Sequence, residues 1–216
     1  MVNNSTATFN NRHELVPYAD QFVKNRIKVF RKDLSICLKA DANGRHAYMP
    51  ALITCISLLE LFSGLYIGKL RFISLKGIIK YAEKFMDSND YSSDRLTVLY
   101  LMFRHKIAHL GRPYGIFDTD TVSHQNREYL REGPRRLISW RVNATDRHPP
   151  IEIIPENGTP SESPPWPVFF SHRCIVSIYR LKVDIVKSAR SYLEHVRMDI
   201  KAQNKFCKCI EEFFPQ

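Results

Sequence analysis

The chain has 216 residues, of which 44% are apolar and 25% are charged, and its formal net charge is +10. Enough apolar surface is present to offset the loss of chain entropy on folding, which excludes a wholly disordered protein. The basic charge favours a polyanionic partner, either a nucleic acid or an acidic membrane surface, and the alternative is a basic protein without such a partner. We expect a single domain over residues 1–216, with room for an insertion.

The N-terminal residues and the cysteines bear on the cellular compartment. The first ten residues or so are polar, lack the apolar core of a secretory signal and are expected to fray. Five cysteines are present, and an odd number favours reduced thiols in a cytoplasmic protein. Cys207 and Cys209 form a C-x-C pair without a second pair, so we expect no metal site and no cofactor.

The first predicted helix covers residues 13–42, where many apolar side chains recur at steps of three or four. Gly44 provides a natural stop after it. Its polar face is strongly basic and carries Lys24, Arg26, Lys28, Arg31 and Lys32.

The second predicted helix runs from Pro50 to about Tyr66 and is apolar nearly all round, so we expect it at the centre of the fold. The stretch 49–67 is nearly long enough to cross a membrane. Glu60 lies inside this stretch, however, and would be costly in lipid. We therefore predict a buried core helix and no membrane partner.

Two further helices are predicted before the chain changes character. Residues 74–86 form a short amphipathic helix that Ser74 can cap. Residues 94–109 form the fourth helix, which ends abruptly before Gly111 and Pro113. The residues that can cap the fourth helix are Ser92, Ser93 and Asp94.

The second half of the chain is predicted to contain strands and one long helix. Two β-rich runs within residues 135–155 favour a hairpin, and a proline-rich loop follows at 156–170. The last long helix covers 171–204. The fold class is therefore mainly α: an up-down bundle of four or five helices with a small β-hairpin insertion before the last long helix. Because the second and fourth helices need burial on both faces, the bundle is expected to form a dimer.

The end of the fourth helix concentrates titratable groups in the sequence LYLMFRHKIAHLG, which contains Arg104, His105, Lys106 and His109. Arginine grips phosphate oxygens, histidine moves protons near neutral pH, and a helix C-terminus favours the imidazolium form. This set suits RNA cleavage, because the ribose 2′-hydroxyl supplies the nucleophile and no metal is needed. The alternative is a helix end whose cations merely complement the helix dipole.

The spacing from Arg104 to His109 is not specific by itself, since Arg190 and His195 repeat it in the last helix. The first copy differs in its context, with an apolar approach and a stop directly after it. There the run LYLMFRHKIAH resembles the signature of HEPN-domain proteins: an arginine, a polar residue, three residues and a histidine. The resemblance covers about residues 94–113.

The resemblance implies a metal-independent endoribonuclease, usually dimeric, with both arginine–histidine pairs in one interfacial cleft. It implies that Arg104 binds the phosphate, that His109 is the acid/base and that His105 supports them. Many such proteins act in toxin–antitoxin or phage-defence systems, so RNA, a second copy of the chain and an antitoxin or defence-partner protein are the expected partners. Some members have lost activity, so a non-catalytic module that binds RNA, nucleotides or a partner protein is the alternative.

Four further residues complete the predicted substrate-binding set, namely Lys106, Arg112, Glu60 and Tyr100. Glu60 is an attractive partner for Arg104, or else a carboxylate at a helix surface or dimer seam. Tyr100 either hydrogen-bonds in the cleft or packs in the core. The basic face of the first predicted helix and a basic run near Trp140 could also follow an RNA backbone, with the aromatic ring as a stacking platform, although a solvated charged face is the default interpretation. The run consists of Arg127, Arg131, Arg135 and Arg136.

Overall fold

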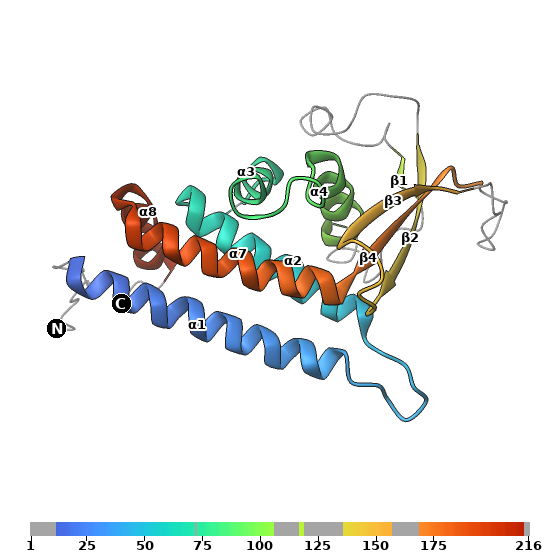
Figure 1. The fold of residues 1–216 in the computed structure, drawn as a ribbon, viewed down its shortest axis with the longest axis horizontal. Coiled ribbons are helices and arrows are strands. Elements are labelled where there is room, and N and C mark those ends of the chain that lie inside the picture. The colour runs from blue at the N-terminus through green and yellow to red at the C-terminus, as the bar shows by residue number, and fades with distance from the viewer. Residues whose placement is uncertain (1–11, 72, 106–116, 119–135, 157–168, 214–216) are drawn as a thin grey trace, which may run out of the picture.

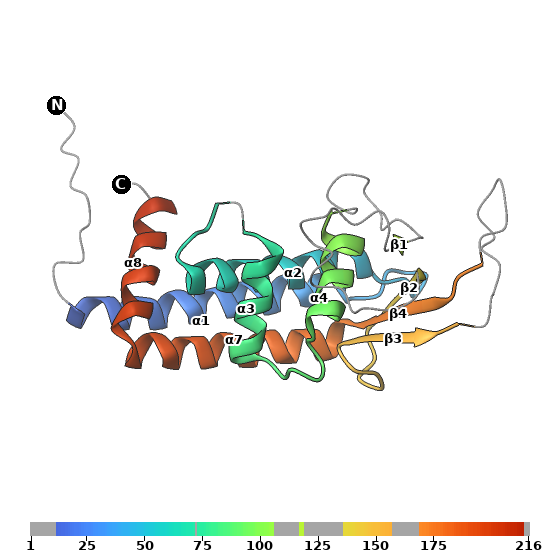
Figure 2. The ribbon, with the colours of Figure 1, turned by 90° about the horizontal axis from the view of Figure 1, so that it is seen from above.

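The computed structural model describes residues 12–71, 73–105, 117–118, 136–156 and 169–213. Helices dominate this part of the chain, and a small sheet lies at one end of them (Figures 1 and 2). The mainly α class is therefore confirmed. The helices are α1 (Arg12–Cys37), α2 (Tyr48–Ile67), α3 (Leu75–Phe85), α4 (Ser93–Leu99), the π-helix η1 (Tyr100–His105), α7 (Ile178–Met198) and α8 (Ile200–Phe213).

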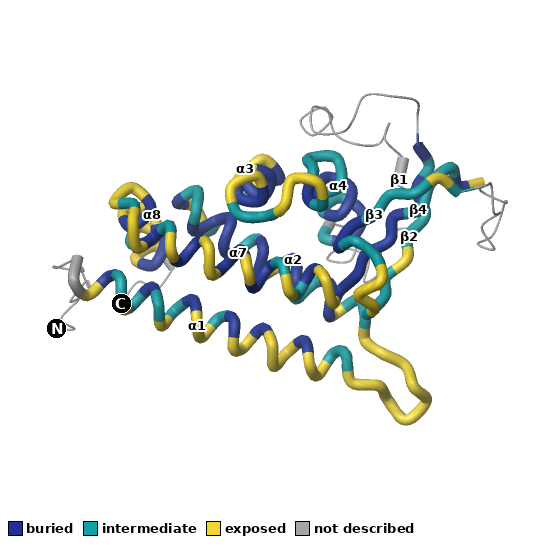
Figure 3. The backbone as a smooth tube through the Cα atoms, in the orientation of Figure 1, coloured by how far each residue is buried: buried dark blue, intermediate teal, exposed yellow. Residues whose placement is uncertain are grey.

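Helix α2 occupies the centre of the helical part, as its nearly uniform apolar surface predicts, and packs against α1, α3, α7, α8 and η1. Ten of its residues are buried, and its dark tube in Figure 3 is flanked by the neighbouring helices. By length and composition alone α2 could cross a membrane, and 56% of its most apolar window is buried inside the protein. Its contacts make it a core helix of this fold.

Capping side chains define where the short helices begin. The Ser74 hydroxyl accepts a hydrogen bond from the amide of Gly77, and the Ser92 hydroxyl accepts one from the amide of Arg95. Each cap satisfies a backbone donor that the first helical turn leaves open. Ser74 is the predicted cap, Ser92 is one of the three candidates for α4, and the start of α3 lies within one residue of its expected position.

The first helix ends five residues earlier than predicted, at Cys37. The reason is a tight turn around Asp41, whose carboxylate accepts hydrogen bonds from the amides of Asn43 and Arg45. Gly44 adopts a φ of 74°, a left-handed conformation that glycine tolerates at little cost. Gly44 thus lies in the turn that follows the helix, as predicted, but the turn already begins at Asp41.

The strands form one sheet in the order β1-β2-β4-β3, to which β1 (Phe117–Asp118) contributes only two residues. Strand β4 (His172–Ser177) pairs in parallel with β2 (Leu137–Asn143) and antiparallel with β3 (Ile151–Pro155). The predicted hairpin is therefore wrong, because β4 separates the two strands that were expected to pair.

The predicted start of the last helix is wrong for the same reason. Residues 172–177 form the central strand, and α7 begins only at Ile178. Cys174, Ile175 and Val176 are buried, and a short apolar run with β-branched residues fits either a buried strand or a helix. Ser177 marks the true boundary, since its hydroxyl accepts a hydrogen bond from the amide of Arg180. The predicted helix also breaks at Asp199, after which α8 begins.

Candidate functional site

The fourth predicted helix changes its winding where the titratable residues begin. It is α-helical from Ser93 to Leu99 and continues as the π-helix η1 from Tyr100 to His105. At the junction the amide of Tyr100 is shared between the carbonyls of Leu96 and Thr97. Single π-turns are rare and occur frequently at functional sites, so this change draws attention to the residues that it carries.

Core packing holds η1 in place. Met102 and Phe103 are fully buried, and the ring of Phe103 meets Trp140 of β2 edge-on at a centroid distance of 6.3 Å. Helix η1 therefore packs against α2 and, through the contact of Phe103 with Trp140, against the sheet. Tyr100 and Arg104, four residues apart, lie on the side of η1 that faces Glu60.

Glu60 is the only charged residue of α2, and it binds Arg104. The Nε–H of Arg104 donates to both carboxylate oxygens of Glu60, with both N···O distances at 3.1 Å. The Glu60 side chain retains 13% of its exposure and that of Arg104 retains 36%. The pairing that the sequence suggested is thus confirmed, and it lies at the boundary between core and solvent.

The hydrogen bonds to Glu60 use only the Nε–H of Arg104. Among the described residues, none accepts a hydrogen bond from either Nη group. Glu60 therefore orients the guanidinium through its Nε edge and leaves the other edge for a further acceptor. A guanidinium edge presents two parallel donors, which is the geometry that recognises phosphate oxygens.

Tyr100 completes the cluster. Burial raises the pKa of Tyr100, the negative charge of Glu60 and a hydrogen bond to Glu60 raise it further, and Arg104 opposes the rise. The phenol therefore stays protonated at neutral pH and acts as a hydrogen-bond donor. Tyr100 also packs against the core as a partly buried residue, and whether it serves a cleft stays a prediction.

Several predicted site residues lie outside the described part of the chain. Lys106, His109 and Arg112 belong to this group, and for His105 only the backbone is described. The end of the predicted fourth helix and most of the proline-rich loop lie outside it as well. The described residues therefore show Arg104, Glu60 and Tyr100 together, and the functional roles of all seven predicted site residues stay predictions.

The basic run before β2 does not supply the predicted nucleic-acid surface at Arg136. This side chain is only 4% exposed and forms two hydrogen bonds with the Asp94 carboxylate, at 3.0 and 2.6 Å. Trp140 is partly buried against Phe103. Trp140 of β2 and Arg136, directly before that strand, are therefore both engaged within the fold. The other members of the run, Arg127, Arg131 and Arg135, lie outside the described residues.

Comparison with known proteins does not add a family. A scan against family models, a search of curated proteins and a search of solved structures each give no match. Within the part of the chain that the structure describes, no group of three or more His, Cys, Asp or Glu side chains is arranged to hold a metal ion.

Proposed function

We propose that the chain is a HEPN-like endoribonuclease that cleaves RNA through attack by the ribose 2′-hydroxyl, without a metal. The observation that carries the proposal is the hold of Glu60 on Arg104, which leaves the Nη donors of a half-buried guanidinium open to a phosphate. Arg104 stabilises the charge that develops on the phosphorane, because a preorganised cation in a partly desolvated site costs little reorganisation.

The proton transfers are assigned to His109. The 2′-hydroxyl loses its proton to an imidazole, its oxygen attacks phosphorus, the bond to the 5′-oxygen breaks and an imidazolium protonates the leaving oxygen. The products are a 2′,3′-cyclic phosphate and a 5′-hydroxyl. One histidine cannot easily serve both ends of the reaction, so the proposal includes an up-down bundle that forms a homodimer with two such sites in one cleft.

The biological setting is part of the same proposal. A cytoplasmic toxin or phage-defence enzyme, neutralised by an antitoxin or joined by a defence-partner protein, fits the resemblance described above. His105 supports Arg104 and His109 in this scheme, while Lys106 and Arg112 add positive charge for the substrate. The net charge of +10 favours association with a polyanion such as RNA.

The test is incubation of the purified protein with RNA in EDTA, followed by analysis of the product ends. Wild-type protein yields cyclic-phosphate ends, and Arg104→Ala and His109→Ala abolish them while circular dichroism shows an intact fold. His46→Ala is the matched control, since this exposed histidine lies in the turn between α1 and α2. Undiminished cleavage by the Arg104 or His109 variant rejects the site.

A second candidate is a module of the same fold that binds RNA or nucleotides, or a partner protein, without cleaving RNA. The Glu60 carboxylate favours it, because a paired guanidinium carries less net charge toward a phosphate. This candidate predicts binding without product and no change on His109→Ala. RNA with a single 2′-deoxy residue at the cleaved position separates the two. An enzyme cleaves the parent RNA but not this substrate, whereas a binding module cleaves neither RNA and binds both equally.

A further inference from the structure

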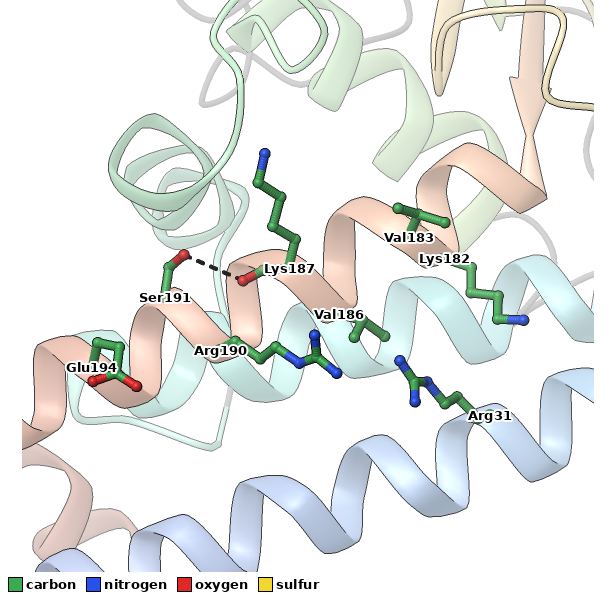
Figure 4. Close-up of a pocket in the computed structure, with 8 residues that line it drawn as sticks. All are labelled: Arg31, Lys182, Val183, Val186, Lys187, Arg190, Ser191 and Glu194. Carbon is green, nitrogen blue, oxygen red and sulfur yellow. Dashed lines mark hydrogen bonds between the residues drawn. The ribbon is translucent and has the colours of Figure 1, made fainter.

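A groove of about 360 Å³ lies between α1 and α7 (Figure 4), and neither Glu60 nor Arg104 is among the residues that line it. The two helices lie side by side along the length of the molecule, and Arg197 of α7 is tied to Asp20 of α1 by an ion pair of 2.6 Å (Figure 1). Arg31 lines the groove from α1, and the opposite wall is one face of α7. The groove is thus built from two long helices whose relative position is held by packing and by an ion pair at one end.

The groove is strongly cationic, with Arg31, Lys182 and Arg190 along it. In Figure 4 the guanidinium groups of Arg31 and Arg190 turn toward each other between the helices. Within the described chain none of the three forms an ion pair. Two like charges that face each other repel, and an anion placed between them removes this cost.

The nearby acids are engaged elsewhere. Glu194, at one end of the groove, accepts a 2.6 Å hydrogen bond from Arg197. Asp184 accepts a hydrogen bond from the hydroxyl of Tyr91, at 3.0 Å. Among the described residues, no carboxylate therefore forms an ion pair with Arg31, Lys182 or Arg190, and their positive charge is available to a ligand.

An exposed aromatic side chain continues the same face of α7. Tyr179 lies four residues before Val183, which lines the groove, and it retains 47% of its exposure. The ammonium of Lys182 lies 5.9 Å from the centroid of its ring. Lys182 and Arg190 are eight residues apart, a rise of about 12 Å along the helix.

We propose that the α1/α7 groove binds a single strand of RNA, with phosphates at Arg31, Lys182 and Arg190 and a base stacked on Tyr179. A cationic groove that follows the backbone, together with an aromatic ring for a base, is the combination used by proteins that bind single strands. A concave, elongated site suits a chain better than the planar surface of an acidic membrane. The choice of RNA rests on the proposed function, but the site lies on other helices and uses other residues.

The test measures binding of a fluorescent single-stranded RNA whose riboses are 2′-O-methylated, so that no 2′-hydroxyl can attack. Arg31→Gln/Arg190→Gln is expected to weaken binding at least tenfold at low salt. The slope of log K against log salt falls by about 1.4, because each phosphate contact on a single strand contributes about 0.7. Lys76→Gln/Lys80→Gln removes the same charge from α3, on the other side of α7 from α1, and stays within twofold of wild type.

Variants at Tyr179 distinguish binding of a single strand, which has bases to stack, from binding of other polyanions. Tyr179→Ala weakens binding about tenfold, and Tyr179→Phe, which keeps the ring, binds like wild type. Equal losses in the two double variants, or no change on Tyr179→Ala, overturn the proposal. So does a groove variant that loses binding to phosphatidylserine vesicles while it keeps RNA. Because the probe cannot be cleaved, a wild-type protein without ribonuclease activity leaves this result unaffected.

Discussion

Arginines at the sheet end of the molecule and in the α1/α7 groove have opposite surroundings. Arg136 and Arg173 lie at the sheet and are paired with Asp94 and Glu156 in positions partly or wholly shielded from water. Arg31 and Arg190 are exposed and face each other. Burial makes an unpaired charge too costly, so the buried arginines have partners and serve the fold. Exposure removes that requirement, and the groove arginines remain available to a ligand.

Arg104 lies between these two cases. It has an acidic partner, as Arg136 does, but its side chain is about one third exposed, like that of Arg173, whereas Arg136 is buried. One edge of its guanidinium is therefore used for positioning and the other can meet a substrate. The contrast predicts that substitution of a buried, paired arginine lowers the stability of the fold, whereas substitution of an exposed groove arginine lowers ligand binding.

The largest expected effect on stability is at Arg136. Arg136→Ala leaves the largely buried carboxylate of Asp94 without its bidentate partner, and we expect the free energy of unfolding to fall by about 3–5 kcal/mol. Urea denaturation followed by circular dichroism measures it. A loss below about 1 kcal/mol contradicts a structural role for this pair, and Arg31→Ala, at an exposed position, is the matched control.

The groove arginines should show the reverse behaviour. Arg31→Gln/Arg190→Gln relieves repulsion, so we expect the free energy of unfolding to stay unchanged or rise by up to about 0.5 kcal/mol at low salt. Salt screens exposed charges, and the difference from wild type disappears at about 1 M salt. Chemical denaturation at two salt concentrations tests this. A destabilisation above about 1 kcal/mol would show that these side chains hold the two helices together.

The smallest expected effect is a pH dependence at Asp184, one of the two acids of α7. Burial raises the pKa of Asp184, although the hydrogen bond from Tyr91 and the charges of Arg180 and Lys187 lower it, and Asp90 adds to the rise. The stability contributed by its protonated form is complete below the unfolded pKa and is lost as pH rises through the folded pKa.

Asp184→Asn mimics the protonated state, so the variant should melt above wild type at pH 7, and the gain should vanish toward pH 3. Melting temperatures at pH 3, 5 and 7 provide the measurement. A variant that melts below wild type at pH 7 would show that the charge of Asp184 stabilises the fold.

The helical half of the molecule was largely predictable because its signals are local. The Ser74 and Ser92 caps and the apolar surface of α2 all lie within one element. The Glu60–Arg104 pair was predictable in part. A single acid in an apolar helix needs a partner, and Arg104 was an attractive candidate. Its hydrogen-bond geometry, in which the Nε–H donates to both carboxylate oxygens, depends on how η1 packs against α2.

The sequence by itself determined the mainly helical character, the central place of α2, the Ser74 cap and the need for a partner at Glu60, because these follow from periodicity, local capping and the cost of burying a charge. Tertiary structure decided that residues 172–177 form the central strand, since an apolar run of this length suits strand or helix until neighbours pair with it. Tertiary structure also decided which arginines are buried in ion pairs and which stay exposed. Arg136 and Arg190 look alike in the sequence, and only packing buried one beside an aspartate and left the other facing a second guanidinium.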